Sequence, residues 1–138
     1  MQLPNEIFIP EIARLVAEGK QVVFTPTGVS MRPYIEGGVD SVTLVRPDDL
    51  QVGDIVLAEV APQHYVLHRI YAMQGDTVTL MGDGNLQGQE KGRTDGIVGT
   101  VTAVIRPDGR RRVPGKGRVW RALKPVRRYL LAIYRRLI

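Results

Sequence analysis

One serine of this chain lies in a sequence context that suits a nucleophile. Ser30 follows the apolar segment 21–25, in a loop that contains Gly28 and lies between Pro26 and Pro33. A serine that forms an acyl intermediate requires an exposed hydroxyl on a rigid turn, with backbone N–H groups nearby to stabilise an oxyanion. A turn serine that makes only a local hydrogen bond fits the same pattern. Ser30 is therefore a candidate that other residues must support.

A histidine is expected in an apolar row of a strand. If residues 65–71 form a strand, Val66, His68 and Ile70 share one face, because side chains alternate along it. Burial lowers the pKa of an imidazole and keeps it neutral, which makes His68 available as a base near pH 7. A histidine that only fills the core is the alternative. His64 would lie roughly 13 Å away along the same strand, too far to share a metal ion. With no cysteine and no second histidine pair in the chain, we expect no zinc site. We also expect no other metal and no cofactor.

A third candidate is the carboxylate of Asp83, in the sequence Gly-Asp-Gly-Asn at 82–85. An Asp-Gly pair is frequent in hairpin turns, so the segment is explained by a turn alone. The functional interpretation places the carboxylate where it orients the imidazole of His68 or supports the site. The segment lacks the Gly-Lys-Ser/Thr ending of a phosphate-binding loop.

The elements that must position these residues are mostly short strands. Segments rich in Val, Ile, Thr and Tyr, bounded by Gly, Pro or Asp, occur at 21–25, 40–46, 54–60, 65–71, 77–81 and 97–105. Their spacing predicts a mainly β fold, an antiparallel sheet that coils into a sandwich or partial barrel. A short helix is expected over 9–19, with Pro10 in its first turn and Gly19 at its end. A turn at 106–109 precedes a short basic strand.

The order and spacing of these segments resemble the signal peptidase and LexA-type serine protease superfamily. Residues 28–33 (Gly-Val-Ser-Met-Arg-Pro) are similar to its nucleophile box, and Gly-Asp-Ile-Val at 53–56 to the start of a strand. His-Arg-Ile at 68–70, followed by Gly-Asp at 75–76, resembles the block that carries the base. In the endoplasmic reticulum and archaeal-like branch this base is a histidine. Residues 82–85, with 95–96 and 99–101, resemble the Gly-Asp-Asn box and closing strand, so the resemblance covers roughly 21–105.

The resemblance implies a serine endopeptidase that cleaves specific protein substrates. Ser30 would be the nucleophile, His68 the general base and Asp83 a supporting residue. The Ser30 backbone N–H would hold the oxyanion, Met31 would lie beneath the site, and the substrate would carry a small side chain beside the cut. Gly28 stands where bacterial signal peptidases often have a hydroxyl. A stand-alone catalytic core is expected, because the sequence shows neither the membrane-spanning segment nor the DNA-binding domain of these relatives.

Charge is divided unevenly along the chain. Residues 1–105 contain 7 Lys and Arg against 13 Asp and Glu, whereas residues 106–138 contain 12 Lys and Arg and one acid, Asp108. The net charge of +5 therefore belongs to the C-terminal segment. We expect an acidic body joined to a segment that is attracted to something anionic.

The C-terminal segment predicts an amphipathic helix over 119–138 that Pro125 interrupts. Trp120, Leu123, Leu130, Tyr134 and Leu137 lie near one stripe. The basic residues expected to contact a membrane or another anion are Arg118, Arg121, Lys124, Arg127, Arg128, Arg135 and Arg136. Three interpretations stay open: an anionic membrane surface, nucleic-acid phosphates, and packing on the sheet with solvated arginines. Relatives that work at membranes favour the first, and nucleic acid is the least favoured.

These patterns predict a helical segment at 1–20, a protease-like β domain at 21–113 and a basic helical tail at 114–138. Met1–Glu6 lacks the basic and apolar regions of a signal peptide, and no window is apolar enough to span a bilayer. We therefore expect a cytoplasmic or peripherally membrane-associated protein. The alternatives to an enzyme are an inactive peptide-binding module of the same fold and a membrane-tethered scaffold.

Overall fold

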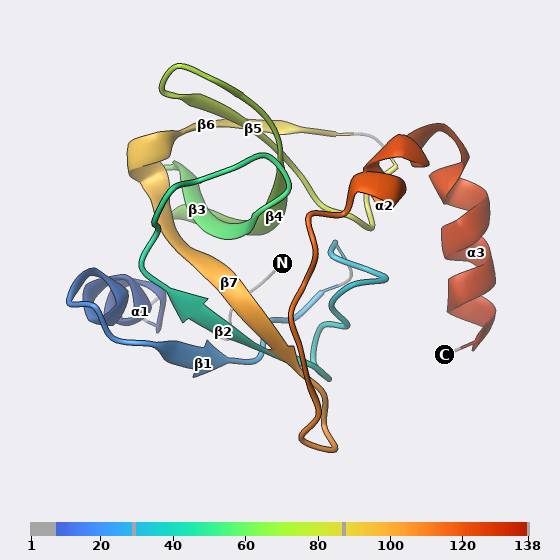
Figure 1. Cartoon of the computed structure of the whole chain (residues 1–138), viewed down its shortest axis with the longest axis horizontal. Helices are drawn as coiled ribbons and strands as arrows, with labels where there is room; N and C mark the ends of the chain where they lie inside the picture. Colours follow the sequence, from blue (N-terminus) through green and yellow to red (C-terminus); the bar gives the residue numbers. More distant parts are fainter. Residues whose placement is uncertain (1–7, 29, 87, 138) are drawn as a thin grey trace.

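A computed structural model describes residues 8–28, 30–86 and 88–137 (Figure 1). The prediction made for Met1–Glu6 lies outside these residues. The described residues form one mainly β domain, a sheet of eight antiparallel strands that curls into a half-barrel, with helices at both ends of the chain. The expected fold class, a mainly β coiled antiparallel sheet with terminal helices, is confirmed.

The strands follow each other along the sheet in the order β1-β2-β7-β3-β4-β5-β6, and β8 pairs with β7. Their bounds are β1 Val22–Phe24, β2 Ser41–Val45, β3 Ile55–Ala61, β4 His64–Gln74, β5 Thr77–Met81, β6 Glu90–Arg93, β7 Ile97–Ile105 and β8 Arg111–Arg112. A 3-10 turn, η1 (Thr94–Gly96), separates β6 from β7. All six predicted strands are present, and β8 is the expected short basic strand. The sequence reasoning missed β6.

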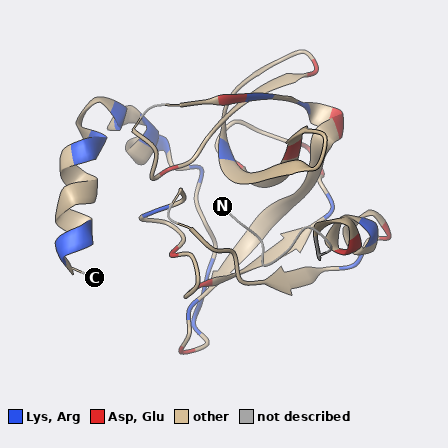
Figure 2. Ribbon diagram, turned by 180° about the vertical axis from the view of Figure 1, so that it is seen from behind, with Lys and Arg blue, Asp and Glu red and all other residues tan. Residues whose placement is uncertain are grey.

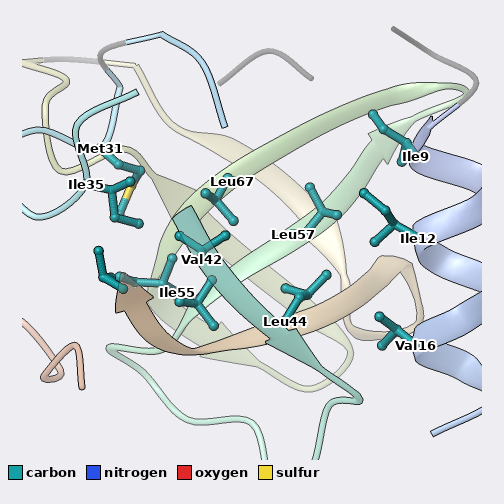
Figure 3. Packing of buried hydrophobic residues seen from close by; sticks show 12 residues of the cluster. Ile9, Ile12, Val16, Met31, Ile35, Val42, Leu44, Ile55, Leu57 and Leu67 are labelled. Atoms are coloured by element: carbon teal, nitrogen blue, oxygen red, sulfur yellow. The ribbon is translucent and has the colours of Figure 1, made fainter. Parts of the chain in front are cut away.

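The sheet has an apolar cluster on each side, because its strands alternate as expected. Leu67 belongs to one cluster and Val66 and Ile70 to the other, so consecutive residues of β4 point in opposite directions. The larger cluster is closed by helix α1 (Phe8–Ala17), which contributes Ile12 and Val16. Figure 3 shows Met31 and Ile35 at the opposite end of this cluster. The core thus reaches the loop that carries Ser30.

The C-terminal segment forms α2 (Arg118–Ala122), the 3-10 turn η2 (Lys124–Val126) and α3 (Arg127–Leu137). The predicted interruption at Pro125 is confirmed, because Pro125 lies in the 3-10 turn between the two helices. Its physical cause is that proline has no N–H to continue the hydrogen bonds of a helix from α2. In the part of the chain that the structure describes, no helix has both the length and the apolar character needed to cross a bilayer.

Candidate active site

Ser30 lies between β1 and β2, in a segment that is anchored on both sides. On one side, the Gly38 N–H donates to the Pro26 carbonyl at 2.6 Å, and a Cβ at Gly37 would lie 2.0 Å from the Gly28 carbonyl oxygen. On the other, the Gly84 N–H donates to the Ser30 carbonyl at 2.7 Å. Ser30 itself is half-buried. Its backbone is therefore held by both neighbouring loops, as a positioned nucleophile requires.

His68 lies near the middle of β4, and its imidazole is 5% exposed. Nδ1 lies 2.5 Å from Oε1 of Glu90. Nε2 is buried and has no hydrogen-bond partner among the described residues. When the ring is neutral, the carboxylate holds the proton on Nδ1, which leaves the lone pair of Nε2 available to accept another.

Burial lowers the pKa of His68 below its ordinary value, and the Glu90 carboxylate acts in the opposite direction. The result of these opposed effects is an imidazole that is neutral near pH 7 yet paired with a negative charge. Such a ring can take up a proton during a reaction, because the carboxylate stabilises the imidazolium that forms.

Glu90 was not among the sequence-predicted site residues. It is the first residue of β6, two strands away from β4, and its side chain is 29% exposed. The register aligns Leu80 of β5 with Ile70 on one side and with Glu90 on the other. This pairing brings the Glu90 side chain within hydrogen-bond distance of His68. The sequence feature that could have indicated Glu90 is the hairpin turn at 82–85. After this turn the chain returns alongside β5, where Glu90 begins β6.

Gly82 lies close to both the Ser30 carbonyl and the His68 ring. A Cβ built at Gly82 would lie 2.3 Å from the Ser30 carbonyl oxygen and 3.1 Å from Cδ2 of His68, the ring carbon bonded to Nε2. Contacts shorter than 3.0 Å do not occur for real Cβ atoms. The absence of a side chain at Gly82 therefore allows the serine backbone and the imidazole to approach the same point.

The functional interpretation expected Asp83 to contact the imidazole of His68. Among the hydrogen bonds of the described residues, none joins these two side chains. The Asp83 carboxylate receives two hydrogen bonds from Arg69, from Nε at 2.9 Å and from Nη2 at 2.8 Å, and both side chains are fully buried. Burial raises the pKa of Asp83, and the Arg69 guanidinium opposes this rise. His68 and Arg69 are consecutive and point to opposite faces, so Asp83 pairs with the arginine. These hydrogen bonds hold the 82–85 turn in place.

The C-terminal segment completes this turn. Nη1 of Arg69 donates to the Gly53 and Gly115 carbonyls, both at 2.7 Å, and the Trp120 indole N–H donates to the Asp83 carbonyl at 2.8 Å. The sequence of residues 114–118 (Pro-Gly-Lys-Gly-Arg) is typical of a linker. In the structure its backbone contacts the buried Arg69 side chain through the Gly115 carbonyl, and Gly117 is buried. Trp120 and Leu131 are buried.

Arg127 cannot serve as a contact for a membrane or another anion, because it is fully buried. Its guanidinium donates to the Asn85 carbonyl at 3.1 Å and to the Tyr71 hydroxyl, and it lies 5.2 Å from the centre of the Trp120 ring. Arg121 is half-buried and donates to the Lys116 carbonyl. Arg118, Arg128, Arg135 and Arg136 are exposed, and Lys124 is half-buried.

A cavity of about 10 Å³ lies beside Ser30. Its lining is mostly apolar and includes Met31, Ile35 and Leu67, with Gly28 at its edge. Met31 is buried, and its sulfur lies 3.5 Å from the Asp83 N–H. Met31 thus lies beneath the loop. The space beside Ser30 has room for about one water molecule.

Comparison of the sequence with models of protein families gave no match, and comparison with curated proteins gave none either.

Proposed function

We propose that this protein is a serine endopeptidase that uses Ser30 as nucleophile, His68 as general base and Glu90 as the carboxylate that orients the base. The observation that carries the proposal is the state of the imidazole. Nδ1 is bonded to a carboxylate, and Nε2 is buried without a partner among the described residues, beside the glycine that also contacts Ser30. A histidine that only filled the core would have little need of a carboxylate at Nδ1 and an unbonded, buried Nε2.

In the proposed reaction, the Ser30 hydroxyl oxygen attacks a peptide carbonyl while Nε2 of His68 accepts the hydroxyl proton. Glu90 stabilises the imidazolium, and the Ser30 backbone N–H stabilises the negative oxygen. The imidazolium then gives its proton to the leaving amine as the C–N bond breaks. Water, deprotonated by the same Nε2, hydrolyses the acyl-enzyme and restores the serine hydroxyl.

The cavity beside Ser30 supports a substrate with a small side chain next to the cleaved bond. Its volume of about 10 Å³ holds about one water-sized group, which favours a small side chain over a large one. We propose cleavage after small residues in one or a few protein substrates. This agrees with the side-chain preference that the family resemblance implies.

The chain offers matched controls for a test of this proposal, because it contains two serines and two histidines. A library of peptides derived from a proteome is incubated with the wild type and with Ser30→Ala and Ser41→Ala, and new N-termini are identified by mass spectrometry. Ser41 lies on β2, where its hydroxyl bonds Thr25 at 2.9 Å. We expect cleavage after small residues that only Ser30→Ala abolishes.

Equal cleavage by the wild type and Ser30→Ala would overturn the proposal. If instead neither protein cuts but both bind extended peptides with the same affinity, the inactive peptide-binding module is the better description.

A further inference from the structure

Helix α3 has an apolar face that covers nothing in the described structure. Tyr129, Ile133 and Leu137 are spaced by four residues, so they lie along one side of the helix. They are 66%, 57% and 80% exposed. We call these three residues the outer face. The opposite side of the helix holds the contacts with the body through Arg127, Leu131 and Tyr134, whose hydroxyl lies 3.3 Å from Glu36.

All the charged residues near the outer face in the sequence are basic. Arg128, Arg135 and Arg136 are exposed on the same helix, and residues 109–138 contain no Asp or Glu. Figure 2 shows that the ribbon of α3 carries basic positions and no acidic ones. Figure 1 shows the helix at the edge of the molecule, beyond the sheet. An apolar stripe and an uncompensated positive charge thus occur on one accessible element.

We infer that the outer face of α3 docks on an anionic lipid surface, with its three side chains in the interface and the arginines against lipid headgroups. A helix of this composition lies in the plane of the interface, its apolar side in the acyl boundary and its cations near the phosphates. Arginine stems are long enough to keep the guanidinium among the headgroups while the helix sinks below them.

Two other occupants fit the outer face less well. A second copy of the chain would bring two sets of arginines together without an acidic residue between them, and three side chains on one helix offer far less area than a stable dimer buries. Nucleic acid would satisfy the arginines but would leave the aliphatic Ile133 and Leu137 in water. An anionic bilayer accommodates both the charge and the apolar side chains.

The test uses the full chain and vesicles of phosphatidylcholine with or without phosphatidylserine. Truncation after residue 113 is unsuitable, since it would also remove the buried Trp120 and Arg127. The outer-face variant combines Tyr129→Gln, Ile133→Gln and Leu137→Gln, and the arginine variant combines Arg128→Gln, Arg135→Gln and Arg136→Gln. The matched control combines Val23→Gln and Val39→Gln, two exposed apolar residues far from α3 in the sequence. Unfolding curves verify that every variant is folded.

We expect the wild type to float with vesicles that contain phosphatidylserine and to bind pure phosphatidylcholine weakly. The outer-face variant should bind more than about tenfold more weakly, and the arginine variant about fivefold more weakly for each charge in contact. The control should bind like the wild type. The inference is overturned if the outer-face variant binds as the wild type does, or if the wild type ignores phosphatidylserine. It is also overturned if the wild type is a dimer that the outer-face variant dissociates while neither binds vesicles.

Discussion

Two consecutive residues of β4, His68 and Arg69, each contact a carboxylate, and the two pairs differ in almost every physical property. Arg69 and Asp83 are both fully buried and bonded by two parallel hydrogen bonds, with two backbone carbonyls as further acceptors. The other pair joins His68 to the partly exposed Glu90 by a single contact, and one ring nitrogen is left without a partner among the described residues.

Under the proposed function, the difference separates a structural pair from a chemical one. In the Arg69–Asp83 pair every charge is matched, so removal of one partner leaves a buried charge uncompensated. In the His68–Glu90 pair the ring can gain a proton without any contact being broken. We therefore expect the first pair to determine stability and the second to determine reactivity.

Substitution of the base should have the largest effect on activity. His68→Gln keeps much of the side-chain volume and cannot take a proton from Ser30, so kcat/KM for peptide cleavage should fall by about 10²- to 10⁴-fold. Its free energy of unfolding should change by less than about 1.5 kcal/mol. His64→Gln, at the exposed start of β4, is the control and should change neither quantity. Loss of activity in both variants would end the assignment of His68 as the base.

The structural pair should show the opposite result. Asp83→Asn leaves the Arg69 guanidinium buried without its counter-charge and should lower the free energy of unfolding by about 3–5 kcal/mol, measured by urea denaturation. The double variant Arg69→Met/Asp83→Leu should recover part of this loss, because no charge then remains unpaired. A stable but inactive Asp83→Asn would assign Asp83 to the chemistry and contradict the division.

Glu90→Gln should reduce activity by about 10²-fold and leave the fold intact, because Glu90 is partly exposed. Its distinguishing effect is on the pH profile. Glu90 raises the pKa of His68 against the effect of burial, so its removal lowers that pKa further. The acid limb of the kcat/KM profile should therefore move to lower pH. Glu18→Gln, in the turn that follows α1, is the control. An unmoved acid limb in Glu90→Gln would show that Glu90 does not act through His68.

The smallest expected effect is on stability at mildly acidic pH. The pKa of His68 lies below its ordinary value in the folded chain and returns to about 6.5 on unfolding. As the pH falls below 6.5, the unfolded chain binds a proton that the folded chain does not, so folding is progressively disfavoured until the folded pKa is reached. The limiting slope is about 1.4 kcal/mol per pH unit. Urea unfolding across this range should show the loss in the wild type and not in His68→Gln.

Much of the fold was predictable because its strands carry strong local signals. Segments rich in Val, Ile, Thr and Tyr, bounded by Gly, Pro or Asp, predicted β2, β3, β4, β5 and β7 to within a few residues. Strand β6 was missed because Glu-Lys-Gly-Arg has no apolar side chain to alternate, and it is held at the edge of the sheet by pairing with β5. A pattern of apolar residues within one segment cannot predict a strand that forms only because it pairs with a neighbouring strand.

The same limit explains what was missed in the site. The alternation of β4 predicted that His68 and Arg69 point to opposite faces of the sheet. It could not assign their partners, because both Asp83 and Glu90 lie close to this pair of residues. Which carboxylate contacts which residue depends on the face of the sheet that each one approaches, and that follows from the register of three strands. In the C-terminal segment, periodicity identified the break at Pro125. It did not show that Arg127 is buried, because that depends on the carbonyl of Asn85 and the rings that surround it.

The attachment of the turn at 82–85 to the C-terminal segment has a consequence for how the protein is made. A growing chain contains Ser30 and His68 well before it contains Gly115, Trp120 and Arg127, which supply the last partners of Arg69, Asp83 and Asn85. While these partners are missing, the turn beside Ser30 and His68 lacks its final supports. Synthesis proceeds at about 5–20 residues per second, so several seconds pass between the addition of His68 and that of Arg127. We therefore expect the 82–85 turn to reach its final geometry only after the later residues have folded against it.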